Sequence, residues 1–336
     1  MLHSLDYRVI MSIFPISPED TMVDLLSYEH GIHAIDSGYV RPQLAAIHLI
    51  VEHGRVVVVD TASNACVPRV LEALQALGLS PACVAYVFLT HVHLDHAGGA
   101  GAMMRAFPEA QLVVHPRGAR HMADPTKLFA AVQEVYGAEE TQRLYGDPLP
   151  IAADRIQEAG DGFSFELAGR SLVCLDTPGH ARHHLCLLDS RSGCLFTGDI
   201  FGMSFRELDV EGRPSIIPTS SPTQFEPEVM HASVDRILAY RPPAVYLTHF
   251  AEVRDVARLG EDLHRLIDAY VAIAEHERDS GLERGTRIQD GLWALMEAEA
   301  VRQGWRLPVD QWREVVRMDI EINAQGLDYW LDQVKR

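Results

Sequence analysis

The stretch FLTHVHLDHAGG, residues 88–99, gathers potential metal ligands directly after an apolar run. His91, His93, Asp95 and His96 fall within six consecutive positions. Neutral imidazole nitrogens and ionised carboxylate oxygens are donors that divalent transition metals prefer. Taken alone, the stretch also fits a solvated polar loop, or a helix start capped by Asp95. A metal site is favoured only if the rest of the chain supplies more ligands.

Further candidate ligands stand at the ends of separate apolar runs. His180 follows LDTPG, Asp199 ends LFTGD and His249 ends VYLTH. Because strand ends are rigid and the loops after them can shape a pocket, these side chains can converge with the histidine cluster at one sheet edge. Gly179 and Gly198 permit the tight turns that such a site needs. The sequence therefore predicts a metal site.

Alternating strand and helix patterns would position these residues. The strand-like runs cover residues 44–54, 55–63, 83–90, 110–116, 171–177, 184–190, 194–199 and 243–249. Helical periodicity marks 67–79 and 97–107, and an amphipathic insertion at 127–147 is expected over the strand ends. The later helical stretches are 255–281, 288–301 and 309–334. This pattern predicts an α/β catalytic domain at 21–255, a C-terminal helical region at 256–336 and an N-terminal extension at 1–20.

Composition and charge exclude several classes of partner. The 336 residues carry 47 acidic against 29 basic side chains, a net charge of −18, which repels nucleic acid. No apolar run reaches the roughly 18 residues of a transmembrane helix, so no membrane partner is expected. The N-terminus lacks the pattern of a signal peptide. Translation is expected to start at Met1 or at Met11. Five cysteines without CxxC spacing favour a reduced, cytoplasmic protein.

The ordered motifs resemble a known family. THVHLDHAGG, DTPGHARHH, FTGD and LTHF, in that order, resemble the signature of the metallo-β-lactamase superfamily, which is HxHxDH followed by histidine, aspartate and histidine. VVVVDTA, residues 56–62, resembles the early family strand that ends in Asp-Thr-Gly, with Ala62 in place of the glycine. The resemblance covers about residues 30–255. It implies a four-layer αββα sandwich with the site at one edge of two sheets, here with a C-terminal helical extension.

The resemblance also implies two metal-binding sets and a bridging residue, Asp199. The ligands of the first metal would be His91, His93 and His180. The ligands of the second would be Asp95, His96 and His249. Two divalent cations about 3.5–4 Å apart would then share one hydroxide. Zinc is expected, with iron or manganese as alternatives, because this nitrogen and oxygen donor set accepts all three.

Residues around the ligands have expected roles as well. Asp60 is expected either to orient the ligand loop or to serve a structural turn, and His184 to pack or hydrogen-bond behind the ligands. His183 is expected at the surface. The side chains that would either line a substrate wall or pack in the core are Phe201, Met203 and Phe205.

The implied reaction is attack by a metal-bridging hydroxide on an ester or thioester, with Asp95 and Asp199 as catalytic residues. Lactone hydrolysis is the alternative, although acyl-homoserine lactonases carry tyrosine where Gly202 stands. Glyoxalase II enzymes share the added C-terminal helices, but IFGMSFRELD replaces their glutathione segment. An alternative of another class is a diiron oxidoreductase or oxygen-binding protein.

The expected partner is a small-molecule substrate with a hydrophobic portion. This expectation follows from the aromatic residues after Asp199 and from the amphipathic insertion. The amphipathic C-terminal helices would cover the pocket, pair two subunits in a homodimer, or both.

Overall fold

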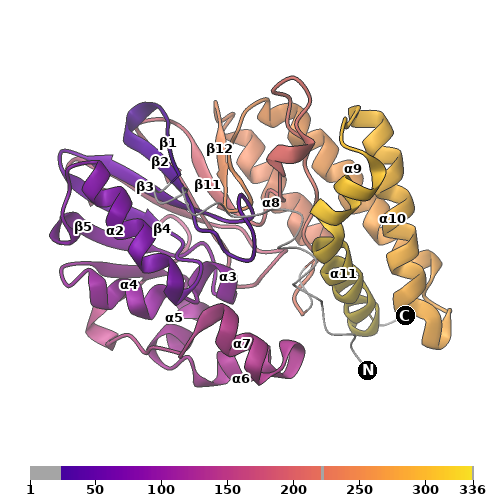
Figure 1. Ribbon diagram of the computed structural model, residues 1–336, viewed down its shortest axis with the longest axis horizontal. Coiled ribbons are helices and arrows are strands. Elements are labelled where there is room, and N and C mark those ends of the chain that lie inside the picture. Colours follow the sequence, from indigo (N-terminus) through magenta and orange to yellow (C-terminus); the bar gives the residue numbers. More distant parts are fainter. Residues whose placement is uncertain (1–23, 221–222, 335–336) are drawn as a thin grey trace.

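Two sheets packed face to face, with helices on their outer faces, form the body of the protein (Figure 1). The computed structural model describes residues 24–220 and 223–334. The prediction of an extension at residues 1–20, and the choice between Met1 and Met11, lie outside the described residues. No helix in the described part of the chain is long and apolar enough to cross a membrane.

The first sheet has the strand order β1-β2-β3-β4-β5-β6-β7. Its strands are β1 (Leu25–Ser27), β2 (Ile32–Asp36), β3 (Ala46–Glu52), β4 (Arg55–Val59), β5 (Val84–Phe88), β6 (Gln111–Val114) and β7 (Ile156–Glu158). Strands β1 to β4 pair antiparallel, and β4 to β7 pair parallel. The β3–β4 hairpin turns at His53 and Gly54, as the sequence predicts.

The second sheet has the strand order β13-β12-β11-β10-β9-β8. Its strands are β8 (Ser164–Leu167), β9 (Arg170–Asp176), β10 (Leu185–Asp189), β11 (Leu195–Gly198), β12 (Val245–Leu247) and β13 (Ala251–Val253). All neighbours pair antiparallel except β11 and β12, which are parallel. The carboxyl ends of β11 and β12 therefore lie at the same edge of this sheet.

Alternation along the strands separates the apolar layers. In β4, Val57 and Val59 pack between the two sheets, whereas Val56 and Val58 pack beneath the helices on the outer face. The helices on that face are α2 (Val67–Ala76) and α4 (Ala100–Ala106). The second sheet is covered by α8 (Pro227–Ala239) and α9 (Val256–His276). The predicted αββα sandwich is confirmed.

The C-terminal helices continue the outer layer over the second sheet (Figure 1). Helices α10 (Arg284–Gln303) and α11 (Val309–Gln333) pack with α9, and their apolar faces join the same core through Tyr270 and Trp312. The predicted C-terminal helical extension is thus present. Because that core also contains Leu247 at the end of β12, α11 is held close to the strand ends.

The remaining helices lie near the edge where the parallel strands end. They are α3 (Leu94–Ala97), α5 (Pro116–Ala123), α6 (Thr126–Tyr136) and α7 (Ala138–Tyr145). The predicted insertion at 127–147 is the α6–α7 pair. Short 3₁₀ helices complete the described elements: η1 (Glu29–Gly31), η2 (Asn64–Cys66), η3 (Pro81–Cys83), η4 (Ala153–Arg155), η5 (Arg206–Leu208) and η6 (Gly281–Glu283).

Candidate metal centre

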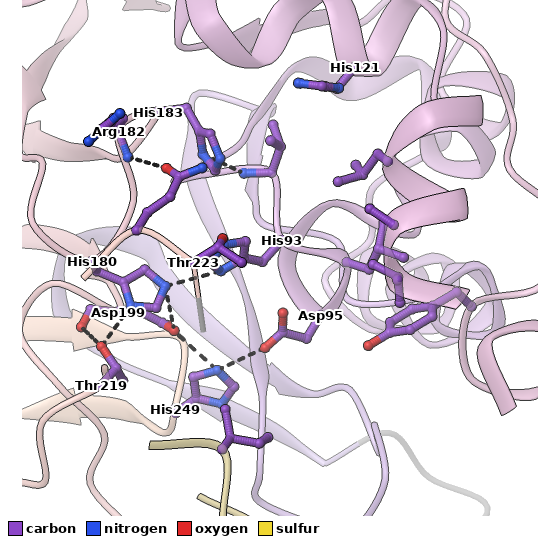
Figure 2. Close-up of a pocket in the computed structure, with 18 of the residues that line it drawn as sticks. His93, Asp95, His121, His180, Arg182, His183, Asp199, Thr219, Thr223 and His249 are labelled. Carbon is purple, nitrogen blue, oxygen red and sulfur yellow. Dashed lines mark hydrogen bonds and ion pairs between the residues drawn. The ribbon is translucent and has the colours of Figure 1, made fainter. Parts of the chain in front are cut away.

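Each candidate ligand follows a strand end. His91 comes after β5, Asp199 directly after β11 and His249 after β12, and His180 lies on the loop after β9. Short helix α3, which begins directly after His93, carries Asp95 and His96. The structure therefore brings residues scattered from 91 to 249 to a single edge of the sandwich (Figure 2).

The side chains gather as two donor groups of the composition that the resemblance implies. In one group, Nδ1 of His93 lies 2.9 Å from Nε2 of His91 and 3.1 Å from Nε2 of His180. In the other, Oδ2 of Asp95 lies 3.5 Å from Nε2 of His96 and 3.4 Å from Nε2 of His249. Within each group the donor atoms all lie within 4.8 Å of one another.

Asp199 lies between the two groups. Its Oδ2 is 3.5 Å from Nε2 of His180, and its Oδ1 is 3.1 Å from Nε2 of His96 and 3.6 Å from Nε2 of His249. One oxygen therefore faces each group, which is the placement that a bridging carboxylate requires. Gly198 makes this turn with a φ of +49°, and a Cβ there would lie 2.7 Å from Nε2 of His184. The close approach explains why glycine stands before Asp199.

Hydrogen bonds behind the ligands determine which ring nitrogen is available. Nδ1 of His249 donates to the carbonyl oxygen of Leu44 at 2.7 Å, which leaves Nε2 as the lone-pair donor. The hydroxyl of Thr219 donates to the carbonyl oxygen of Asp199 at 3.1 Å, so it accepts at 2.9 Å from Nδ1 of His180. The residues behind the cluster thus turn Nε2 of both histidines toward the site.

Asp60 organises the other half of the cluster. Its carboxylate accepts hydrogen bonds from the hydroxyl of Thr90 at 2.9 Å, from Nδ1 of His96 at 2.9 Å and from the hydroxyl of Thr248 at 2.8 Å. Through these bonds it ties the end of β5 to the end of β12. His184 also lies behind the ligands, where its Nε2 accepts from the backbone N–H of Asp199 at 3.3 Å.

The pKa shifts of the ligand histidines differ between the two donor groups. Burial lowers the pKa of His91, and burial with the neighbouring His180 lowers the pKa of His93 to about 3. Burial also lowers the pKa of His180 to about 4. These imidazoles are neutral at pH 7, which is the form that binds a metal ion.

The carboxylates have the opposite effect on the other two histidines. Burial opposes charge on His96 and His249, but Asp199 and Asp95 together outweigh it, raising the pKa of His96 above its usual range and that of His249 to about 9. Burial likewise opposes ionisation of Asp199, but His96 and His249 hold its pKa well below the usual range. The buried ionised carboxylates therefore need positive charge beside them, which protons on the histidines or bound cations would supply.

The donor atoms fit divalent cations. Among the described residues no hydrogen bond satisfies the buried Nε2 of His96 or the buried Oδ1 of Asp199, which is costly unless another group does so. Both atoms face the space between the ligand groups, and imidazole nitrogen with carboxylate oxygen suits zinc, iron or manganese. The donor set is therefore consistent with the predicted metal site.

The cluster opens into a cavity of about 1180 Å³. Cluster members in its wall include His93, Asp95, His180, Asp199 and His249. Apolar side chains from the α6–α7 insertion and from α11 complete much of the wall: Leu128, Ala131, Val132, Leu144, Tyr145, Met318 and Ile322. The insertion and the C-terminal region thus both contribute to the pocket.

The predicted substrate wall after Asp199 is correct only in part. Met203 lines the cavity, whereas Phe201 and Phe205 are fully buried in the core with α8 and α9. The prediction that these two phenylalanines line the pocket is wrong, because both side chains are enclosed by the apolar residues of the core over the second sheet.

The cavity also contains histidines that the sequence did not assign to it. His183, expected at the surface, is buried and accepts a hydrogen bond from the backbone N–H of Val92 through its Nδ1 at 3.4 Å. His121 of α5 lies at the same end of the cavity (Figure 2). Their spacing in the sequence does not indicate that these two histidines line a cavity, because their positions depend on how α5 packs beside the loop after β9.

The chain belongs to the metallo-beta-lactamase superfamily, whose sequence model matches residues 40–263. Most members of this superfamily are hydrolases. Membership agrees with the sandwich fold and with the resemblance of the ligand motifs.

Three named relatives are distant in sequence. The chain is 26% identical over 224 residues to the metallo-beta-lactamase fold-containing protein ST1585 of Sulfurisphaera tokodaii, covering 65% of this chain and 78% of that one. It is 32% identical over 143 residues to a hydroxyacylglutathione hydrolase of a Synechococcus species, covering 42% and 44%. It is 29% identical over 116 residues to the atrochrysone carboxyl ACP thioesterase of Aspergillus fumigatus, covering 34% and 27%. The chain thus spans less than half the length of these last two proteins.

Solved structures share the fold. The structure of ST1585 superposes with a TM-score of 0.61 at 23% identity, covering 89% of this chain and 98% of that one. The metallo-beta-lactamase family protein TTHA1429 of Thermus thermophilus gives 0.58 at 21% identity, covering 90% and 93%.

Proposed function

We propose that this protein is a hydrolase that cleaves an ester or thioester with the help of two divalent cations. The observation that carries the proposal is the composition of the cavity. The histidine and carboxylate cluster shares that cavity with apolar side chains from three helices, so a reactive carbonyl and a hydrophobic portion can be held together.

The relatives support the same class of reaction. One is named as a thioesterase and another as a hydrolase of hydroxyacylglutathione, although each matches only part of this chain. An acyl group attached to sulfur or oxygen is thus the substrate class that we infer for this cavity.

The proposed metal ligands are the residues of the two donor groups with Asp199 between them. Two divalent cations held there would supply a hydroxide nucleophile at neutral pH and polarise the scissile carbonyl. The chain's own contribution begins with Asp60 and Thr219, which hold the imidazoles of His96 and His180 in fixed orientations. This positioning removes reorganisation when the substrate binds.

Asp95 is the proposed proton carrier. Its Oδ2 faces His96 and His249, and 28% of its side chain is exposed to the cavity. In Figure 2 the second carboxylate oxygen points away from His249. That oxygen can accept a proton from the attacking water and return it to the departing sulfur or oxygen. The apolar walls exclude bulk water, which strengthens these interactions.

The test is hydrolysis by protein reconstituted separately with zinc, manganese and iron, assayed on acyl thioesters, esters and lactones. We expect turnover of thioesters or esters, and a loss of at least about 1,000-fold in kcat in Asp199→Ala and His180→Ala, because several kcal/mol of transition-state stabilisation are removed. Lactone opening alone would make the protein a lactonase. Iron-dependent oxygen chemistry without hydrolysis would contradict the proposal.

A further inference from the structure

Four cations line the cavity. They are Arg117 and Arg120 of α5, Lys127 at the start of α6 and Arg182 from the loop after β9. This gathering is notable in a chain with a net charge of −18. In Figure 2, Arg182, His183 and His121 lie at one end of the cavity, and His249 of the ligand cluster lies at the opposite end.

Three of these cations form no ion pair with the described residues. No carboxylate among them lies within ion-pair distance of Arg117, Arg120 or Lys127, and all three residues are exposed. The carboxylate of Asp124 accepts from the backbone N–H of Thr126 at 3.1 Å and acts electrostatically on Lys127 at longer range. Arg182 differs, because it forms an ion pair with Glu226 at 2.6 Å.

The unpaired cations are oriented by their neighbours. Nη1 of Arg117 donates to the carbonyl oxygen of Arg182 at 3.1 Å, and Nε of Arg120 donates to Nε2 of His121 at 3.3 Å. The first of these bonds ties α5 to the loop that carries His180, and the second lies within α5. The side chains therefore belong to the wall of the cavity while their remaining N–H groups stay available to a ligand.

The acidic residues of the cavity lie elsewhere. Asp95 and Asp199 belong to the ligand cluster, and Asp319 of α11 is buried close to the opposite end, where His249 and Arg41 act on it. Glu226 is neutralised by Arg182. The field at the end near α5 is thus positive, whereas the apolar side chains lie on α6, α7 and α11.

We infer that the substrate carries a phosphate at the end of its leaving-group arm, and that Arg117, Arg120 and Lys127 bind this phosphate while the acyl chain lies against the apolar wall. The inference rests on the proposed ester or thioester hydrolysis and adds the substrate's second recognition element. Guanidinium groups match phosphate oxygens with paired hydrogen bonds, and a further ammonium group favours a dianion over a single carboxylate.

Binding of two thioethers that cannot be hydrolysed tests this inference on the full-length protein. S-decyl-pantetheine and S-decyl-4′-phosphopantetheine share the alkyl chain and differ only in the phosphate. By calorimetry we expect the phosphorylated compound to bind at least about 10-fold more tightly, with an advantage that shrinks as salt rises. In the Arg120→Gln/Lys127→Gln double variant the two dissociation constants should agree within about two-fold.

Arg105→Gln is the matched control, because Arg105 is an exposed arginine of α4 that does not line the cavity. This variant should keep the full preference for the phosphorylated compound. Equal affinities in the unchanged protein, or a preference that survives in the double variant, would overturn the inference.

Hydrolysis of the corresponding decanoyl thioesters separates this inference from the proposed function. Faster turnover of the phosphorylated thioester, lost in the double variant, supports both. Selective binding of the phosphorylated thioether without hydrolysis of any ester or thioester would leave the phosphate site standing and contradict the proposed reaction. Equal turnover of both thioesters together with equal thioether binding would contradict the phosphate site alone.

Discussion

Oδ2 of Asp60 lies 2.9 Å from Nδ1 of His96, and both side chains are almost completely buried. Asp60 follows β4, whereas His96 belongs to α3, so the bond links two separate elements of the site. The same oxygen accepts from the hydroxyl of Thr248, the residue before His249. One carboxylate therefore positions two ligands of the same donor group.

This arrangement predicts the effect of Asp60→Asn. The amide cannot accept all the hydrogen bonds that the carboxylate accepts, so metal affinity should fall by about 10- to 100-fold while the overall fold persists. Metal content after dialysis against a graded chelator measures the change. Asp154→Asn, at an exposed site, is the control. Unchanged affinity in Asp60→Asn would show that Asp60 serves only the turn.

Thr219 provides a second test of ligand positioning. Thr219→Val keeps the size of the side chain but removes the oxygen that accepts from His180, so kcat should fall by about 10- to 100-fold. Thr219→Ser restores the hydroxyl and should recover most of the activity. A serine variant as impaired as the valine variant would indicate that Thr219 acts through packing.

Alanine substitutions at Gly198 and Gly212 distinguish two reasons for a glycine, its backbone conformation and the lack of space for a Cβ. In Gly198→Ala the added Cβ would lie 2.7 Å from Nε2 of His184 and 2.8 Å from Cβ of Thr90, both packed behind the ligands. Gly212 has a comparable φ of +76°, but a Cβ there meets nothing within 4 Å. Gly212→Ala should therefore lose only about 1 kcal/mol of unfolding free energy, and Gly198→Ala about 2 kcal/mol or more, with loss of activity. Equal losses in urea unfolding would refute the steric account.

The buried His48 should make the folded protein less stable in acid. It is buried in β3 with its ring edge-on to those of Phe196 and Tyr246, and burial lowers its pKa to about 4, although Asp60 acts in the opposite direction. The unfolded chain binds a proton near pH 6.5 and the folded chain does not, so stability falls as the pH drops from 6.5 toward 4.

His48→Phe should remove this component. Between pH 7.5 and pH 5 the free energy of unfolding of the metal-free wild type should fall by about 2 kcal/mol more than that of the variant. Urea unfolding of both metal-free proteins at each pH measures the difference, and metal loss cannot contribute to it. Parallel pH profiles would mean that His48 is protonated in the folded protein.

The candidate ligands could be predicted because each stands in a short, recognisable sequence pattern. His91, Asp199 and His249 each end an apolar run, and a run of apolar residues that stops at a polar one marks where a strand leaves the core. The order of these runs along the chain then resembles one family closely enough to imply the sandwich.

Other features depend on packing that a sequence does not display. Thr219 lies in a stretch without periodicity, so nothing in the sequence indicated its contact with His180. Phe201 and Met203 follow the same aspartate and both join the core, yet only Met203 also lines the cavity. Five strands were missed. β1, β7 and β13 have only three residues each and β8 has four, whereas β2 mixes polar with apolar positions.

The most direct measurement of the central claim is anomalous X-ray diffraction from crystals of the metal-loaded protein. We expect two metal peaks about 3.5–4 Å apart with Asp199 between them. His91, His93 and His180 should surround one peak, and Asp95, His96 and His249 the other. A single peak held by only one of these groups, or no peak near Asp199 under saturating metal, would contradict this claim.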